Sequence, residues 1–422
     1  MGASGALSLL STPAYPLPGA VGNDNAGLSR RPPRAKQNSE PPSVSGGRPR
    51  SSKSFTTRRS RPRPRPWLFR RTWALPLVLM LAFVSLYALN PSESNVLHRF
   101  LFLSYRLDDD QHGHRYGKGP WDLAFVCFYT VVLSFAREFV MHEVLRPLAR
   151  RGGIRSRGKQ VRFMEQMYTV CYIAFIGPLG LYTMRQTPGL WYFETRGMYE
   201  GFPHTTHAAV FKFYYLFQAA FWVQQAIVML LGQEKRRKDF RELVAHHIIT
   251  IALIGLSYRF HFTYMGIAVY ITHDISDFFL AISKSLNYLS HQLQVPAFAL
   301  CIAMWIYQRH YLNLSILRSV ATEFATVGPF GLDWPAQQYK CRLSQAVTLA
   351  LLAALQALNL FWLGCLLRSA YRFVALGVAR DDRSEGEEED EAEVVGDGQA
   401  RDSRAGLSER RTGKKGLGVK QC

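Results

Sequence analysis

Five ionisable side chains lie within two consecutive apolar segments of the chain, and their types could perform acid–base chemistry. They are His246, His247, His273, Asp274 and Asp277. Ionisable groups are expensive inside apolar segments of membrane length and generally mark a functional site. A carboxylate beside a histidine fixes the imidazole tautomer and stabilises the imidazolium, which is typical of proton transfer. We therefore expect these five residues to share a functional cavity.

Helical spacing predicts which of these side chains share a face. His273 and Asp277 are four residues apart and Asp274 and Asp277 are three apart, so each pair lies on one side of a helix. The adjacent His246 and His247 point about 100° apart on a helix. One of them could line the cavity while its neighbour supports it. A single histidine of this kind is often only a hydrogen-bonding residue between helices, but five ionisable groups in two segments favour a shared site.

A metal centre is the alternative chemistry for this set. Two adjacent histidines and the sequence His273-Asp274-x-x-Asp277 could hold one ion only in a distorted geometry. The histidine clusters of membrane di-iron enzymes are missing from the sequence. We therefore expect no metal and no bound cofactor, and we favour proton transfer.

The polarity of this 422-residue chain is concentrated at its two ends. Residues 1–66 are rich in Arg, Pro, Ser and Gly, and residues 376–422 are charged, so neither segment can bury enough apolar surface to fold. We expect the first to be a disordered basic segment and the second a disordered cytosolic tail. Between them, residues 67–160 should form two transmembrane helices and a cytosolic loop, and residues 161–375 the catalytic membrane domain.

The middle of the chain predicts an all-α integral membrane protein with about eight transmembrane helices. Their expected positions are 72–89, 121–141, 166–184, 206–231, 243–257, 263–283, 296–312 and 345–371. The connections 142–165 and 233–242 are strongly basic, which places them in the cytosol together with both termini. The net charge of +20 would also suit nucleic-acid binding. The arginines beside the first apolar block follow the positive-inside rule, however, so we expect no nucleic-acid partner.

Several other features are expected to be structural. The six cysteines show neither a disulfide framework nor metal-ligand spacing. The glycosylation sequon at Asn313 abuts a membrane span. His204 and His207 lie at a loop edge, and Trp222 and Gln225 should pack and line a cavity rather than perform chemistry.

The sequence from Glu242 to Tyr288 resembles the Lag1 motif of ceramide synthases, within the larger TLC-domain family. The matching features are His246-His247, Thr250, Gly266, His273-Asp274, Asp277, Lys284 and Tyr288. Residues 135–149 and 159–172 are also similar to that family, and the similarity covers about residues 70–375. Because the homeobox-like insert of many animal members is missing, the chain is most similar to fungal-type members.

The resemblance implies an acyl-CoA-dependent sphingoid-base N-acyltransferase of the endoplasmic reticulum membrane. Such an enzyme joins a fatty acyl group to the amine of a long-chain base and forms ceramide or its dihydro or phyto form. The resemblance also implies a helical barrel around an intramembrane cavity, with acyl-CoA, sphingoid base and membrane lipid as partners. Fungal relatives often work with a small single-span accessory subunit, and homo- or hetero-oligomers are a further option. In the family, the lumenal loop before the last span, here within 313–344, influences the preferred acyl length.

The reaction that the resemblance implies needs a deprotonated amine and a stabilised tetrahedral oxyanion. A positioned general base is worth about 10²–10⁴ in rate. One histidine of the His246–His247 pair could be that base, or could be a nucleophile that forms an acyl-imidazole, and the sequence leaves both routes open. His273, Asp274 and Asp277 would orient that histidine and balance the imidazolium charge.

Two weaker site predictions concern charged segments. The basic residues just before the histidine pair could bind the phosphates of CoA, although the positive-inside rule explains them equally well. They are Lys235, Arg236, Arg237, Lys238 and Arg241. Ser384 in the acidic tail precedes Glu387 by three residues, which suits phosphorylation by an acid-directed kinase.

Two other classes of protein remain as alternatives. A TLC-domain protein without catalysis, acting in lipid handling or protein translocation, need not keep the histidine pair and the His273-Asp274 cluster. A transporter with an intramembrane proton relay predicts internal repeats, and the sequence shows none.

Overall fold

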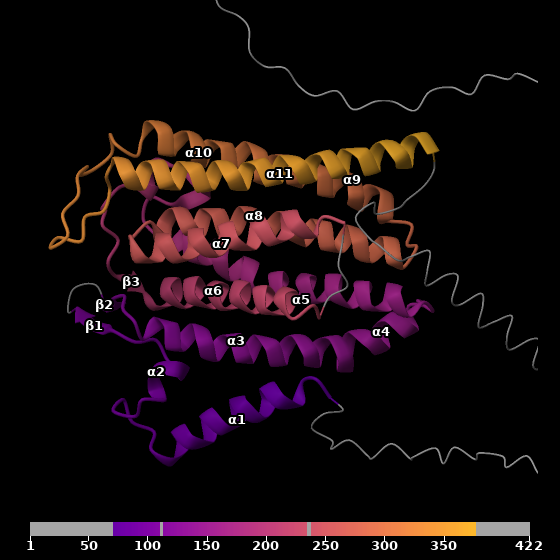
Figure 1. Cartoon of the computed structure of the whole chain (residues 1–422), viewed down its shortest axis with the longest axis horizontal. Coiled ribbons are helices and arrows are strands. Elements are labelled where there is room, and N and C mark those ends of the chain that lie inside the picture. The colour runs from indigo at the N-terminus through magenta and orange to yellow at the C-terminus, as the bar shows by residue number, and fades with distance from the viewer. Residues whose placement is uncertain (1–70, 110–112, 234–237, 377–422) are drawn as a thin grey trace, which may run out of the picture. The chain divides into compact units, whose positions relative to one another are not determined.

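The structure is a computed structural model that describes residues 71–109, 113–233 and 238–376. The predictions for residues 1–66, for the tail from residue 377 and for Ser384 concern residues outside this part. The described chain is almost entirely helical (Figure 1). Its elements in chain order are α1 (Ala74–Leu89), α2 (His98–Leu101), β1 (Arg106–Asp109), β2 (Gly113–Tyr116), α3 (Asp122–Phe139), the π-helix η2 (Val140–Leu145), α4 (Arg146–Arg151), α5 (Arg157–Gln186), the 3₁₀ turns η3 (Trp191–Phe193) and η4 (Arg196–Met198), β3 (His207–Ala208), α6 (Ala209–Leu230), α7 (Phe240–Arg259), α8 (Thr263–Tyr288), α9 (Gln294–Trp305), the π-helix η5 (Ile306–Leu312), α10 (Asn313–Thr322) and α11 (Arg342–Leu376).

The protein is a multi-pass membrane protein. Six helical stretches in the described residues are long and apolar enough to cross a bilayer: α3 with its continuation to Arg151, α5, α6, α7, α8 and α11. Helix α1 is apolar but shorter, and α9, η5 and α10 form one continuous helical stretch. All eight apolar blocks identified in the sequence fall on helices, which confirms the all-α membrane class.

Several helices extend beyond the apolar blocks that predicted them. The block at 166–184 lies inside α5, which begins nine residues earlier at Arg157, and the block at 243–257 lies inside the 20-residue α7. The reason is physical: apolar composition reports the part that meets lipid, whereas backbone hydrogen bonding continues into the polar boundary. The turn before α5 needs Gly153, whose φ of +80° is readily adopted only by glycine.

Six helical elements contact one another in a closed ring. The order around the ring is α5, α6, α7, α11, η5 with α9, and α8, which contacts α5 again. Helix α3 packs on the outside of α6, and α1 packs on α3, as Figure 1 shows. Buried aromatic side chains of α5, α6 and α8, among them Tyr172, Tyr214 and Tyr270, fill much of the space between these helices. This ring matches the expected helical barrel.

A small antiparallel sheet differs from the purely helical expectation. Strand β1 pairs with β2 from Arg106 opposite Tyr116, and β2 pairs with β3 through Tyr116 opposite His207. The sheet lies at the end of the bundle opposite α4 (Figure 1). We call this end, with the segments 187–207 and 323–341, the sheet end, and we call the end with α4 and the start of α5 the basic end. Short polar stretches without helical periodicity satisfy their backbone groups here by pairing.

Candidate active site

An apolar cavity of about 290 Å³ extends from the middle of the ring toward the sheet end. Helices α7, α8 and α11 form most of its wall, with His246 and His273 at the inner part. At the sheet end it is lined by Leu332, Trp334 and Tyr339 of the connection before α11. Its wall is composed mainly of aliphatic and aromatic side chains, so it suits a hydrocarbon chain.

A second, polar cavity of about 250 Å³ lies toward the basic end. Its wall includes Arg162 and Glu165 of α5 and Asp277 and Lys284 of α8. The two cavities adjoin inside the ring, and we call the place where they share a wall the cavity junction. Among the described residues, Trp222 and His246 alone line both of them. These two side chains therefore stand where a ligand in one cavity could react with a ligand in the other.

Both histidines of α7 are buried, but their environments differ. The Nδ1–H group of His247 donates to the backbone oxygen of Leu243 at 2.9 Å, which leaves Nε2 as the basic nitrogen. His247 lines only the polar cavity. The Nδ1 atom of His246 is buried without a hydrogen-bond partner among the described residues, while the rest of its ring lines both cavities. The expectation that the two side chains present different faces is confirmed.

His246 is enclosed by three rings from three other helices. Its centroid lies 5.5 Å from that of Trp222 in α6 and 5.2 Å from that of Trp362 in α11, both edge-to-face. The ring of His273 in α8 is stacked at 6.5 Å. The histidines of the two antiparallel helices α7 and α8 therefore converge inside the ring.

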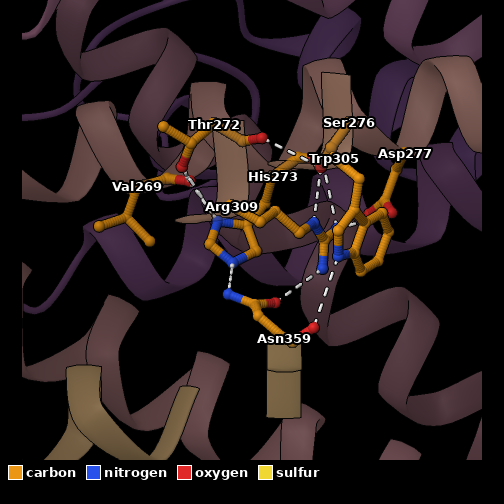
Figure 2. Close-up of polar contacts among 8 residues, drawn as sticks. All are labelled: Val269, Thr272, His273, Ser276, Asp277, Trp305, Arg309 and Asn359. Atoms are coloured by element: carbon orange, nitrogen blue, oxygen red, sulfur yellow. Dashed lines mark hydrogen bonds and ion pairs between the residues drawn. The ribbon is translucent and has the colours of Figure 1, made fainter. Parts of the chain in front are cut away.

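His273 is held by hydrogen bonds at both ring nitrogens (Figure 2). Nδ1–H donates to the backbone oxygen of Val269 at 2.8 Å, so Nε2 is the acceptor. The side-chain amide of Asn359 donates to Nε2 at 3.3 Å. His273 is thereby fixed in one tautomer and orientation, with Asn359 supplied by α11.

A buried arginine that the sequence interpretation overlooked organises this side of the site. Arg309 of η5 is 2 % exposed and donates to Asp277 Oδ1 at 2.6 Å, to Ser276 Oγ at 2.6 Å and to Asn359 Oδ1 at 3.1 Å (Figure 2). Its guanidinium lies 4.1 Å from the ring centroid of Trp305. A cation inside an apolar stretch was itself the signal that could have identified this residue.

The two aspartates of α8 diverge to different partners. Asp277 forms the ion pair with Arg309, whereas Asp274 accepts a hydrogen bond from the side-chain amide of Gln218 in α6. Gln218 in turn accepts from the Tyr172 hydroxyl at 2.9 Å. Both carboxylates line the polar cavity. The structure thus places all five predicted side chains in the walls of the two cavities, but each carboxylate serves a separate network.

The basic segment before α7 is only partly within the described residues. Lys235, Arg236 and Arg237 lie outside them, while Lys238 and Arg241 are exposed. The cations that line the polar cavity are instead Arg162 and Lys284, together with Arg309.

The remaining predictions concern metal ions, glycosylation and cysteines. No three His, Cys, Asp or Glu side chains lie close enough to hold a metal ion within residues 71–109, 113–233 and 238–376. Asn313 of the sequon is 1 % exposed and donates to Gln356 Oε1 at 2.7 Å, so a glycan has no access to it in this fold. The cysteines of the described part are free thiols: Cys127, Cys171, Cys301, Cys341 and Cys365.

Comparison with known proteins adds to this geometry. A family model described as a TLC domain matches residues 162–368, which cover all or most of every helix of the ring. A sphingosine N-acyltransferase-like protein FUM17 of Gibberella moniliformis is 58 % identical over 336 residues, which cover 77 % of this chain and 87 % of the relative.

Two yeast proteins are also similar along most of their length. Sphingosine N-acyltransferase lac1 of Schizosaccharomyces pombe is 47 % identical over 320 residues, covering 76 % of this chain and 82 % of the relative. Ceramide synthase LAG1 of Saccharomyces cerevisiae is 46 % identical over 327 residues, covering 77 % and 79 %.

Proposed function

This chain belongs to the TLC-domain family, and from that premise we propose that it is a ceramide synthase. It is an acyl-CoA-dependent N-acyltransferase that moves a fatty acyl group onto the amine of a sphingoid long-chain base. The product is ceramide or its dihydro or phyto form. The names of its relatives favour this activity over a non-catalytic role in lipid handling or translocation.

One observation carries the proposal: an imidazole stands at the junction of an apolar and a polar cavity. The apolar cavity suits the hydrocarbon part of the acyl donor, and the polar cavity suits its CoA part. In this arrangement the thioester carbonyl lies beside His246, because that ring lines both cavities. Enclosure by Trp222, Trp362 and His273 holds the ring in place and excludes water.

The geometry favours His246 as the residue that acts directly at the acyl carbonyl. As a nucleophile, its nitrogen lone pair attacks the carbonyl carbon, the C–S bond breaks, and CoA leaves as a thiolate that takes up a proton. The amine then attacks the acyl-imidazole, forms the C–N bond, and releases the imidazole and a proton. As a general base, His246 instead removes the proton from the attacking amine within a single acyl transfer. His247, in the polar cavity, is placed to exchange protons on either route.

The other predicted catalytic residues are proposed to position the site. His273 contacts the ring of His246 and is locked by Val269 and Asn359. Asp277 neutralises Arg309, and Asp274 is held by Gln218. Because Asp277 offsets the charge of Arg309, the arginine opposes a positive charge on the nearby imidazoles less than it would alone.

The phosphates of CoA are proposed to bind cations at the basic end. Arg162 and Lys284 line the polar cavity directly. A second proposed contact is the basic segment around the start of α7 in the sequence, which contains Lys235, Arg236, Arg237, Lys238 and Arg241. The acyl-CoA is a co-substrate, and we propose no bound cofactor.

Location and assembly follow the family. We propose the endoplasmic reticulum membrane, with the basic end and both termini in the cytosol, because CoA and the basic connections belong on that side. A small single-span accessory subunit and a homo- or hetero-oligomer remain proposals, as does phosphorylation of Ser384.

The decisive experiment uses purified protein with a long-chain base and acyl-CoA, and measures ceramide by mass spectrometry. His246→Ala should lower turnover by about 10³-fold or more, since the reacting imidazole is lost. His291→Ala, at the exposed turn after α8, is the matched control and should retain activity.

The two routes differ when acyl-CoA is supplied without base. A nucleophile releases one CoA per enzyme in a burst and leaves the protein heavier by one acyl group, whereas a general base does neither. Full ceramide synthesis by His246→Ala would disprove the assigned site.

A further inference from the structure

The indole N–H of Trp222 is buried at the cavity junction and has no hydrogen-bond partner among the described residues. Two other tryptophans near the site do use theirs. Trp362 donates to Asp239 Oδ2 at 3.1 Å, and Trp305 donates to the backbone oxygen of Asn359 at 3.4 Å. An unpaired buried donor costs stability, and a phenylalanine would pack without that cost. The N–H of Trp222 therefore calls for an acceptor that a ligand brings.

Trp222 lies next to both histidines of α7. Its ring centroid is 5.5 Å from that of His246 and 5.8 Å from that of His247, both edge-to-face. With His246 it is one of the two described residues that line both cavities. An acyl carbon attacked beside His246 consequently places its oxygen within reach of the indole.

The walls of this site limit the other sources of an N–H donor. His246 and His273 lie in the interiors of α7 and α8, where each backbone N–H is already bonded to the carbonyl four residues earlier. Backbone donors of the kind found at helix N-termini are thus absent from these two walls. On these two walls, a donor for developing negative charge has to come from a side chain.

We propose that Trp222 donates its indole N–H to the oxyanion of the tetrahedral intermediate. This inference rests on the proposed N-acyltransferase function. When a nitrogen lone pair attacks the acyl carbonyl carbon, the π electrons move to the oxygen, and that oxygen accepts the hydrogen bond. The bond is released when the carbonyl reforms and the leaving group, CoA thiolate or imidazole, departs. Trp222 gives up no proton, and it serves both acyl transfers of the covalent route and the single acyl transfer of the general-base route.

The sharpest test replaces Trp222 by 3-benzothienylalanine, which keeps the ring shape and substitutes sulfur for the N–H group. We expect kcat to fall by about 10²–10³-fold, as for loss of one oxyanion donor, while KM for acyl-CoA stays unchanged. The same replacement at Trp121, a partly exposed residue just before α3, is the control and should leave kcat unchanged. Trp222→Phe should show the same split as the isostere.

Binding of a non-hydrolysable acyl-CoA thioether measures the correctly folded fraction of each variant, so that a folding defect is not read as a catalytic one. If kcat, calculated for the folded fraction, is the same in the Trp222 variants as in the unmodified protein, the proposal is overturned. If His246→Ala is inactive in the same experiment, the proposed function still stands. The Tyr270 hydroxyl is a buried donor that also has no partner within the described part of the chain, but Tyr270 lines only the apolar cavity. A fall in kcat for Tyr270→Phe with no fall for the Trp222 variants would therefore also overturn the proposal. No ceramide synthesis by the unmodified protein would instead reject the proposed function.

Discussion

Arg309 Nη2 lies 2.6 Å from Asp277 Oδ1, and this ion pair joins η5 to α8 with the arginine almost completely buried. Arg309 also reaches Asn359, whose amide holds His273. A charge buried to this degree is tolerated only when it is paired and hydrogen-bonded. The pair therefore links the stability of the bundle to the orientation of the site.

Removing one member of this ion pair should lower the free energy of unfolding far more than removing both. Arg309→Met removes the buried cation that pairs with Asp277, and we expect the free energy of unfolding to fall by about 3–5 kcal/mol, seen as a lower Tm in detergent. The double variant Arg309→Met with Asp277→Asn should recover much of the Tm but not the ceramide synthesis, since the contacts to Asn359 stay lost.

An exposed ion pair provides the control for that experiment. Arg196 and Glu200 are 2.8 Å apart but largely exposed, so Arg196→Met should change Tm little. Equal Tm losses for Arg309→Met and Arg196→Met would contradict the structural role assigned to the buried pair.

Gly266 controls the width of the apolar cavity beside Tyr215. A Cβ at Gly266 would lie 2.6 Å from the Tyr215 hydroxyl, and both residues line the cavity. Gly266 is seven residues before His273, about 10 Å along α8. Gly266→Val should therefore shift the products toward ceramides with shorter acyl chains, measured by mass spectrometry with a mixture of acyl-CoAs.

A second glycine separates this effect from a change in helix propensity. Gly255 of α7 faces open space: among the described residues, no atom beyond the adjoining backbone of its own helix lies within 4 Å of where a Cβ would stand. Gly255→Val introduces the same branched side chain into a helix, yet it should leave the product distribution unchanged. A similar shift in both variants would show that cavity width is not the cause.

The convergence of His246 with His273 could be predicted because it depends only on local patterns. A short connection makes two consecutive helices antiparallel neighbours, and helical periodicity sets the face on which each polar side chain lies. Few arrangements of these side chains are then possible. Arg309 and Asn359 could not be placed in the same way, because they come from helices 32 and 82 residues beyond Asp277 in the sequence, as their numbers show. Helical periodicity contains no information on which distant faces meet.

The same limit explains why the position of Trp222 between the two cavities could not be predicted from the sequence. In the sequence it is one aromatic residue in an aromatic helix, and packing is the reasonable interpretation. Only the arrangement of α6, α7 and α11 reveals that its ring lines both cavities and that its N–H lacks the partner found by Trp362.

Charge reversal at the basic end should distinguish cavity cations from general surface charge. Arg162→Glu or Lys284→Glu should raise KM for acyl-CoA by about tenfold or more, because a charge-assisted hydrogen bond to phosphate is worth about 1.5–3 kcal/mol. Lys238→Glu with Arg241→Glu changes exposed positions, so any rise in KM should be smaller and should disappear at high salt.

The control for these variants is Arg150→Glu, an exposed position of α4 at the same end. It should leave KM unchanged. If Arg162→Glu and Lys284→Glu behave like this control, the phosphates bind elsewhere, and the segment from Lys235 to Arg237 becomes the site to test.

Protein stability should fall as the pH drops from neutral, and His204 at the sheet end should contribute to that loss. His204 is buried against the ring of Tyr264, and burial lowers its pKa to about 4, although Nε2–H donates to the backbone oxygen of Glu200. In the unfolded chain a histidine has a pKa of about 6.5. Between these values the unfolded state binds the proton and the folded state does not, so unfolding becomes more favourable by up to about 1.4 kcal/mol per pH unit.

His204→Gln should therefore show a shallower fall of Tm between pH 7 and pH 5 than the unmodified protein. His291→Gln, at an exposed turn, should keep the full slope. Identical slopes for all three proteins would mean that His204 takes up its proton equally in the folded and unfolded states.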